Sequence, residues 1–247
     1  MFYWNEDRIR FMRDAAEFTR MNDVLCGHIR RYLSREDTIL DVGCGLGYLS
    51  LALAPCCKHV FAADSCPEAL AVLHENLQSD GVKNVTPLLG DVFTMSLPEP
   101  VDAMVFSFFG SVEDTLNLLR KHGANKAFLI KKDWKEGRFP SEHRMSKAYS
   151  FTAACEKLHA MEIPFLAERM TLDMGQPFRS ETDALLFCKQ YGTPGKGETL
   201  SPESIRSQLT KTGREDFPLY LPMESGLGMV ILDAKDIPGE TEAADRA

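Results

Sequence analysis

The chain has 247 residues, of which 44% are hydrophobic and 26% charged, and its 28 basic and 36 acidic side chains give a formal charge of −8. This composition is typical of a folded globular protein of about one domain and excludes a largely disordered chain. The acidic balance, with a pI near 5.3, disfavours partners rich in phosphate, because nucleic acids and membrane surfaces attract basic proteins.

The first expected element is a helical segment over residues 5–33, which predicts an N-terminal helical cap of residues 1–35. Its side chains on one helical face recur at spacings of three and four and are apolar except for one asparagine. They are Phe11, Ala15, Phe18, Asn22, Leu25, Ile29 and Leu33. We expect the segment to break near Phe18.

Strands and helices then alternate through a predicted core of residues 36–175. One expected helix begins at an N-cap Ser65, has Pro67 at its first position and ends at Gly81, and another runs from Ser111 to Gly123. This alternation predicts an α/β fold with a doubly wound, Rossmann-like sheet of seven or eight mostly parallel strands. The first five strands are expected at 38–42, 60–63, 85–89, 101–106 and 127–130.

The rhythm changes in the last hundred residues. A helix is expected near 145–161 and a strand near 166–174, followed by helices that begin at Ser180 and at Ser201. Residues 176–214 are therefore predicted to form a helical insertion that caps the sheet.

A C-terminal hairpin is predicted over residues 215–236. Apolar runs at 218–223 and 227–232 flank Glu224-Ser225-Gly226, which has the length and composition of a turn between antiparallel strands. The hairpin would add an antiparallel strand to the sheet. The remaining residues, 237–247, are expected to be a disordered tail.

Cysteine usage is typical of a protein in a reducing compartment, and the hydropathy pattern predicts no membrane span. The seven cysteines are odd in number and include no C-x-x-C pair, so neither a disulfide framework nor a zinc site is expected. No apolar run approaches the roughly 20 residues that span a bilayer. The chain is expected to be cytoplasmic, without a membrane partner.

The most informative stretch is Ile39-Leu40-Asp41-Val42-Gly43-Cys44-Gly45-Leu46-Gly47, an acid at a strand end followed by G-x-G-x-G and a helix. Glycines let the backbone turn sharply and let a ligand approach it closely. A dinucleotide fingerprint, G-x-G-x-x-G, would have its third glycine where Tyr48 stands, which disfavours a nicotinamide oxidoreductase. Cys44 is interpreted as a small loop residue and not as a nucleophile.

This stretch resembles motif I of the class I S-adenosylmethionine-dependent methyltransferases, and two further acids stand where that family has them. Asp64 ends the second strand, where the family uses an acid to hold both ribose hydroxyls. Asp91 follows the third strand, where an acid accepts a hydrogen bond from the adenine amino group. The resemblance covers residues 36–134. Taken singly, Asp64 could serve only the dipole of the next helix and Asp91 only a turn.

The resemblance implies a site for S-adenosylmethionine, with S-adenosylhomocysteine as the product. It would consist of Asp41, Gly43, Cys44, Gly45, Asp64, Ser65, Asp91, Val92 and Ser107. The backbone around Gly43 and Gly45 would lie against the methionine part, with Asp41 near its ammonium group. The Val92 amide would reach an adenine ring nitrogen, and Ser107 would lie beside the substrate opening.

Departures from subfamily patterns narrow the chemistry. Residues 107–110 read Ser-Phe-Phe-Gly, so the Asn/Asp-Pro-Pro-Tyr/Phe motif of DNA amine methyltransferases is absent and DNA is excluded as a partner. The same place lacks the acids of the magnesium-dependent catechol-type enzymes, so no catalytic metal is predicted. Because the sulfonium methyl is already electrophilic, alignment and water exclusion matter most. No catalytic residue is assigned, and Tyr3, Asp133 and His143 are the candidates for a base.

Three other features have two interpretations each. The aromatic Phe2-Tyr3-Trp4 would anchor the first helix or close over the site as a lid. Residues 120–147 hold nine Lys or Arg against three acids, which indicates a solvated face or a surface that steers an anionic substrate or RNA. Arg179 could hold a carboxylate, whereas Ser180 and Asp183 are typical of helix capping.

The sequence therefore predicts methyl transfer from S-adenosylmethionine to a small-molecule acceptor, with an anionic acceptor as one option. The alternatives are a tRNA or protein methyltransferase and a non-catalytic, cofactor-binding partner or sensor subunit. The acidic charge of the chain disfavours RNA.

Overall fold

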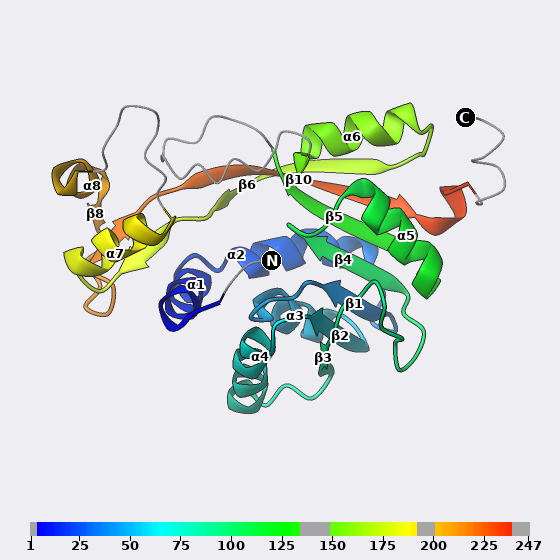
Figure 1. The fold of residues 1–247 in the computed structure, drawn as a ribbon, viewed down its shortest axis with the longest axis horizontal. Helices are drawn as coiled ribbons and strands as arrows, with labels where there is room; N and C mark the ends of the chain where they lie inside the picture. The colour runs from blue at the N-terminus through cyan, green and yellow to red at the C-terminus, as the bar shows by residue number, and fades with distance from the viewer. Residues whose placement is uncertain (1–3, 134–148, 192–200, 239–247) are drawn as a thin grey trace.

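The computed structural model describes residues 4–133, 149–191 and 201–238 (Figure 1). Its centre is a seven-stranded sheet in the order β3-β2-β1-β4-β5-β10-β6. The strands are β1 (Thr38–Val42), β2 (His59–Asp64), β3 (Val85–Leu89), β4 (Ala103–Ser107), β5 (Lys126–Lys132), β6 (Leu166–Asp173) and β10 (Glu224–Asp233). Strands β1 to β5 pair in parallel, and β10 pairs antiparallel with both β5 and β6. The predicted mostly parallel, doubly wound sheet is confirmed.

Helices cover both faces of this sheet. The apolar sides of α2 (Met21–Ile29), α3 (Tyr48–Leu53) and α4 (Pro67–Asp80) belong to one buried cluster, and those of α5 (Val112–His122) and α6 (Phe151–Ala160) to a second. Successive side chains of a strand point to opposite faces, so Ile39 of β1 lies in the first cluster and its neighbour Leu40 in the second. Both faces being covered explains why the central strands are apolar throughout.

The helix α4 begins one residue later than predicted, at an N-cap Cys66 and not Ser65. This helix has no side-chain cap; the amide of its N-cap residue, Cys66, instead donates a hydrogen bond to the Asp64 carboxylate (2.9 Å). Pro67 stands at the first helical position and Gly81 ends the helix with φ +66°, as predicted. Helix α5 also has its predicted limits, because Ser111 forms a capping box at its start.

The N-terminal segment is two helices, α1 (Glu6–Thr19) and α2, as the periodicity predicts. They meet at Arg20, whose φ of 52° is left-handed and breaks the helix two residues beyond the predicted position.

A second, three-stranded sheet extends the molecule at the end where α1 lies (Figure 1). It consists of β7 (Gln176–Phe178), β9 (Leu219–Leu221) and β8 (Thr210–Lys211), joined by α7 (Glu181–Tyr191) and α8 (Pro202–Gln208). We call residues 174–223 the cap. The prediction of a purely helical insertion at 176–214 is wrong in this respect, because the segment also supplies β7 and β8.

The predicted C-terminal hairpin is wrong. Residues 224–226 do not turn but form the first part of β10, where Glu224 pairs with Asp173 and Gly226 with Thr171 of β6. The preceding apolar run contributes β9 to the sheet of the cap. Residues 224–226 have the composition of a turn, but pairing with β6, about fifty residues earlier in the chain, keeps them extended. Of the predicted tail, residues 239–247 lie outside the described ranges.

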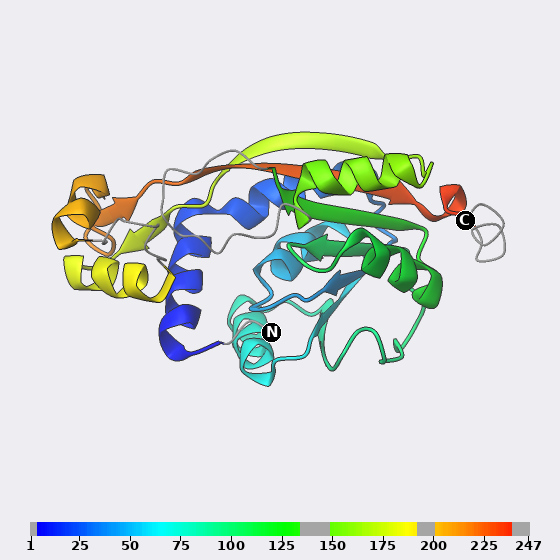
Figure 2. The ribbon, with the colours of Figure 1, turned by 45° about the horizontal axis from the view of Figure 1, so that its top comes forward.

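The cap is continuous with the central sheet. Residues 174–175 alone separate β6 from β7, and residues 222–223 alone separate β9 from β10. The Met174 amide donates to the Met223 carbonyl (2.8 Å), so the two links also bond to each other. Figure 2 shows β6 and β10 running out of the core into the cap. Because β10 begins where the parallel strands end, the cap lies toward the carboxyl edge of the sheet.

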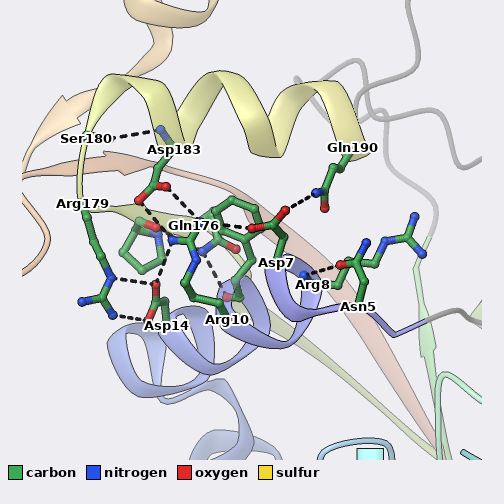
Figure 3. A network of polar contacts seen from close by, with 12 residues as sticks. Asn5, Asp7, Arg8, Arg10, Asp14, Gln176, Arg179, Ser180, Asp183 and Gln190 are labelled. Carbon is green, nitrogen blue, oxygen red and sulfur yellow. Dashed lines mark hydrogen bonds and ion pairs between the residues drawn. The ribbon is translucent and has the colours of Figure 1, made fainter. Parts of the chain in front are cut away.

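Helix α1 is fixed to the cap by a network of polar contacts (Figure 3). Arg10 donates two hydrogen bonds to Asp183 of α7 (2.9 and 3.1 Å). Arg179 donates to Asp14, whose side chain is only 2% exposed, at 2.7 and 3.4 Å. Gln176 of β7 donates to a carbonyl of α1 (3.1 Å). Arg179 therefore does hold a carboxylate, which belongs to the protein itself.

We expect Arg179→Met to lower the free energy of unfolding by about 1–3 kcal/mol, because it leaves the buried Asp14 without its nearest cation. Arg206→Met is the control: it removes an Arg contact of similar length to Glu181 (2.8 Å), but both side chains are about half exposed. Urea unfolding followed by circular dichroism measures both. Equal losses in the two variants would contradict the importance of the Asp14 contact.

All seven cysteines are free thiols. Among the described residues, no helix is both long and apolar enough to span a membrane.

Candidate cofactor site

The loop between β1 and α3 has a backbone that favours glycine. Gly43, Gly45 and Gly47 have φ values of +68°, +55° and +77°, all in the left-handed region. The amides of Gly43 and Cys44 both donate to the Ala63 carbonyl (2.9 and 3.0 Å). This glycine loop is therefore bound to the end of the neighbouring strand β2.

Asp64, at the end of β2, joins the glycine loop to the start of α4. One carboxylate oxygen accepts the Gly45 amide (2.8 Å) and the other accepts the Cys66 amide (2.9 Å). A carboxylate has about four acceptor positions, so each oxygen can accept one further hydrogen bond. Asp64 is partly exposed and can offer these positions to a ligand.

A pocket with about 290 Å³ of empty space, partly open to solvent, lies beside this loop. It brings together five residues that the sequence predicts, namely Gly43, Asp64, Ser65, Asp91 and Val92. Its other lining residues are Ala63, Gly90 and Phe109. The predicted Asp41, Cys44, Gly45 and Ser107 do not line it.

Two neighbouring groups give the pocket a donor and an acceptor. Asp91 uses one carboxylate oxygen to accept the Phe93 amide (2.9 Å), and within the described ranges its other oxygen has no partner. Val92 is 5% exposed, and its amide also has no partner among the described residues. Because Val92 lines the pocket, this amide can donate to water or to a ligand there.

Asp41 is not at the surface of the pocket. It is 1% exposed, and its carboxylate accepts the Ser50 hydroxyl (2.6 Å). Burial, aided by the charge of Asp64, raises the pKa of Asp41 to about 6, although the Ser50 hydrogen bond opposes this shift. Ser107 ends β4 and is half-buried.

The buried Asp41 predicts a pH-dependent stability. Its pKa is higher in the folded chain than in the unfolded chain, so between pH 4 and 6 the folded state binds more protons. Its contribution to the free energy of unfolding therefore falls as the pH rises through that window. We expect this contribution to be about 2 kcal/mol smaller at pH 7.5 than at pH 4.5. The Asp41→Asn variant should not show this loss of stability between pH 4.5 and 7.5. Urea unfolding of the wild type and the variant at both pH values measures it. The same pH dependence in the wild type and the variant would contradict the prediction.

The thiol of Cys44 is protonated at neutral pH. Burial and the negative charges of Asp41 and Asp64 raise its pKa well above its usual value. This agrees with the interpretation of Cys44 as a loop residue and not a nucleophile.

The structure adds one aromatic residue, Phe109, to the predicted set. The Phe109 ring covers Gly43 so closely that a Cβ there would stand 2.3 Å from it. Its ring also stacks with that of Phe93 at a centroid distance of 6.3 Å. The sequence predicts Ser107 at the site but gives no local signal that Phe109 forms this wall.

Trp4 precedes α1 and lies over the glycine loop. A Cβ on Gly45 would stand 3.3 Å from its indole, which also packs against a cluster of Leu46, Ala69 and Val72. Trp4 therefore both anchors the first helix and covers part of the loop, so the two interpretations of the aromatic cluster are compatible. Phe2 and Tyr3 lie outside the described residues.

Of the three candidate bases, the structure describes only Asp133, and Asp133 is not in the pocket. Both carboxylate oxygens of Asp133 are engaged, one by Arg169 (2.7 Å) and the other by the Thr152 hydroxyl (3.2 Å). Asp133 does not line the pocket. Tyr3 and His143 lie outside the described residues. In the part of the chain that the structure describes, no three His, Cys, Asp or Glu side chains are grouped to hold a metal ion.

The basic segment 120–147 is partly structural. Three of its lysines, Lys121, Lys126 and Lys131, donate hydrogen bonds to main-chain carbonyls, which are those of Phe93, Tyr32 and Phe109 respectively. These three ammonium groups therefore have structural partners within the chain itself. Residues 134–148 of the segment lie outside the described ranges.

The residues that line this pocket lie in a part of the chain that is similar to known methyltransferases. The model of the family described as "Methyltransferase domain" matches residues 39–127. A curated protein of Methanosarcina acetivorans, "Probable ribosomal RNA small subunit methyltransferase A", is 38% identical over 90 residues, which are 36% of this chain and 32% of that protein. "Probable cobalt-precorrin-6B C(15)-methyltransferase (decarboxylating)" of Methanothermobacter thermautotrophicus is 34% identical over 89 residues, 35% of this chain and 46% of that protein.

These alignments thus span less than half the length of both curated relatives. Among solved structures, the YcgJ protein of Bacillus subtilis has the same fold, with a TM-score of 0.51 and 19% identity over 84% of this chain and 97% of that chain. The matched residues 39–127 run from β1 to β5 and hold the glycine loop, Asp64 and Asp91. The matched family model and these relatives assign residues 39–127 to the class I S-adenosylmethionine-dependent methyltransferase superfamily.

Proposed function

We propose that this chain binds S-adenosylmethionine in the pocket beside the glycine loop and transfers its methyl group to a small-molecule acceptor. The observation that carries the proposal is the arrangement of Asp64, Asp91 and the unpaired Val92 amide around one pocket. A nucleoside offers two ribose hydroxyls, an amino group and ring nitrogens, and these three protein groups match them as acceptors and donor.

The residues present fit this cofactor. Asp64 would accept the ribose hydroxyls with the acceptor positions that Gly45 and Cys66 leave unused. The Val92 amide and the second oxygen of Asp91 would hold the adenine edge, and Phe109 would form an apolar wall. When bound, the cofactor supplies an electrophilic methyl group, so the chain has to align the acceptor and exclude water. Asp133, held by Arg169, is not proposed as a base.

The proposal of a small-molecule acceptor rests on the net charge of −8 and on the cap at the carboxyl edge of the sheet, where ligands of open α/β sheets bind. The cobalt-precorrin relative acts on a small molecule by its name, which agrees with this. An RNA acceptor is the second candidate, since another relative is named as a ribosomal RNA methyltransferase. The comparisons do not support our prediction that RNA is disfavoured.

Calorimetric titration tests the cofactor. We expect S-adenosylmethionine and S-adenosylhomocysteine to bind with micromolar affinity and NADH to give no heat; binding of NADH alone would refute the proposal. Transfer of a radiolabelled methyl group, measured in parallel with a panel of small acceptors and with total RNA at low salt, then separates the two acceptor classes. Label that enters RNA alone would reject the small-molecule proposal. Cofactor binding without transfer to any acceptor would favour the sensor alternative.

A further inference from the structure

Lys131 is a buried lysine beside the pocket. It lies near the carboxyl end of β5, is 3% exposed, and its ammonium group donates to the carbonyls of Phe109 (3.1 Å) and Gly110 (2.5 Å). These two carbonyls belong to the loop between β4 and α5. The Lys131 side chain therefore links β5 to the loop that follows β4, the strand beside β5 in the sheet.

The backbone of this loop is unusual. Phe108 has φ +57° and Gly110 has φ +61°, so both residues are left-handed, and Phe108 is one of three residues other than glycine with positive φ in the described chain. A left-handed aromatic residue persists only where its surroundings hold it. The two hydrogen bonds from Lys131 fall on the carbonyls directly after Phe108 and provide such a restraint.

The charge of Lys131 is poorly compensated. Among the described residues it has no ion pair. The charged group that favours its ammonium form is Asp114 of α5, whose carboxylate oxygen accepts from the amide and hydroxyl of Ser111. Burial lowers the pKa of Lys131 to about 8, although Asp114 acts in the opposite direction. A buried cation of this kind weakens the fold unless its hydrogen bonds repay the desolvation, and such groups concentrate at functional sites.

We propose that Lys131 is a positioning residue of the cofactor pocket: by holding the backbone of residues 108–110, it fixes the Phe109 ring as the wall over Gly43. The proposal rests on the proposed function for its ligand. Lys131 itself does not line the pocket and acts through Phe109, which does.

The first test compares Lys131→Met with Lys126→Met. Lys126 lies near the other end of the same strand and also donates to a main-chain carbonyl, that of Tyr32 (3.1 Å), away from the pocket. We expect Lys131→Met to raise the dissociation constant for S-adenosylhomocysteine about tenfold, and Lys126→Met to leave it unchanged. Equal effects of the two variants would overturn the proposal. If Lys131→Met does not fold, Lys131→Gln, which is too short to reach both carbonyls, replaces it.

A double-mutant cycle separates positioning from direct contact or general loosening. In a Phe109→Ala background, Lys131→Met should have no further effect on the dissociation constant, because its target ring is gone. Effects that multiply would show that Lys131 does not act through Phe109 and would overturn the proposal.

Amide hydrogen exchange provides a readout without ligand. Residues 108–111 should exchange faster in Lys131→Met than in wild type or Lys126→Met, whether or not the proposed cofactor binds. Unchanged exchange there would overturn the proposal even if cofactor binding is found. Faster exchange in a protein that binds no cofactor would keep the restraint on the loop and reject the proposed function instead.

Discussion

Asp64→Asn should weaken the binding of both S-adenosylmethionine and S-adenosylhomocysteine by about 30-fold or more, which corresponds to about 2 kcal/mol. In the structure each oxygen of Asp64 accepts an amide, one from Gly45 and one from Cys66. Asparagine has one acceptor oxygen, so its NH2 group must face one of these amide donors. The variant therefore loses one acceptor for the proposed ribose hydroxyls and also loosens the glycine loop.

Asp102→Asn is the matched control for this variant. Asp102 also accepts a main-chain amide at 2.8 Å, that of Thr38. Thr38 is the first residue of β1, whereas the glycine loop follows the last residue of this strand. Replacement of Asp102 should leave the affinity unchanged, and calorimetry measures both variants. Wild-type affinity in Asp64→Asn would remove Asp64 from the proposed site, and an equal loss in Asp102→Asn would assign the effect to the fold.

Gly43→Ala should abolish measurable cofactor binding. The new Cβ would stand 2.3 Å from the Phe109 ring, and the residue would have to keep a φ of +68°. A contact this short forces the ring or the loop to move, and both border the pocket. Because the ring belongs to the loop that Lys131 holds, the clash is not relieved by a simple rotation of a surface side chain.

Gly81→Ala separates the clash from the backbone strain. Gly81 has almost the same φ, +66°, but a Cβ there would have no atom within 4 Å. Both variants should lose about 1 kcal/mol of stability from the left-handed backbone. Only Gly43→Ala should lose binding, measured by calorimetry after thermal melts have shown that both proteins are folded. Normal binding in Gly43→Ala would refute the location of the site.

The fold and much of the candidate site follow from local signals. Short apolar runs between helix caps predict where the first five strands lie along the chain. Side chains that follow parallel strands meet at one edge of the sheet. Asp64 and Asp91 end up around one pocket for this reason. The position of the glycine loop is also predictable from sequence, because its glycines permit the left-handed backbone that the loop has, whatever residues lie nearby in the fold.

What the sequence did not predict depends on distant partners. Glu224-Ser225-Gly226 has the composition of a turn, but β6 provides an antiparallel neighbour that extends the strand through it. Lys131 was counted in a basic surface, although its ammonium binds carbonyls about twenty residues earlier and is buried. The sequence places Asp41 near the proposed ligand but does not predict that its carboxylate is buried and accepts the Ser50 hydroxyl. No local pattern reports such contacts.

The position of β10 also determines when the molecule can be completed during synthesis. In the described sheet, β6 is an edge strand with β10 as its only neighbour, and β10 lies between it and β5. The ribosome makes β6 about fifty residues before β10. Until β10 emerges, β6 lacks the strand that it pairs with in the folded sheet, and β9, a partner of both β7 and β8, arrives only shortly before. In the described chain the strands of the cofactor half are therefore synthesised first, and those of the cap reach their native pairing only after β9 and β10 have been made.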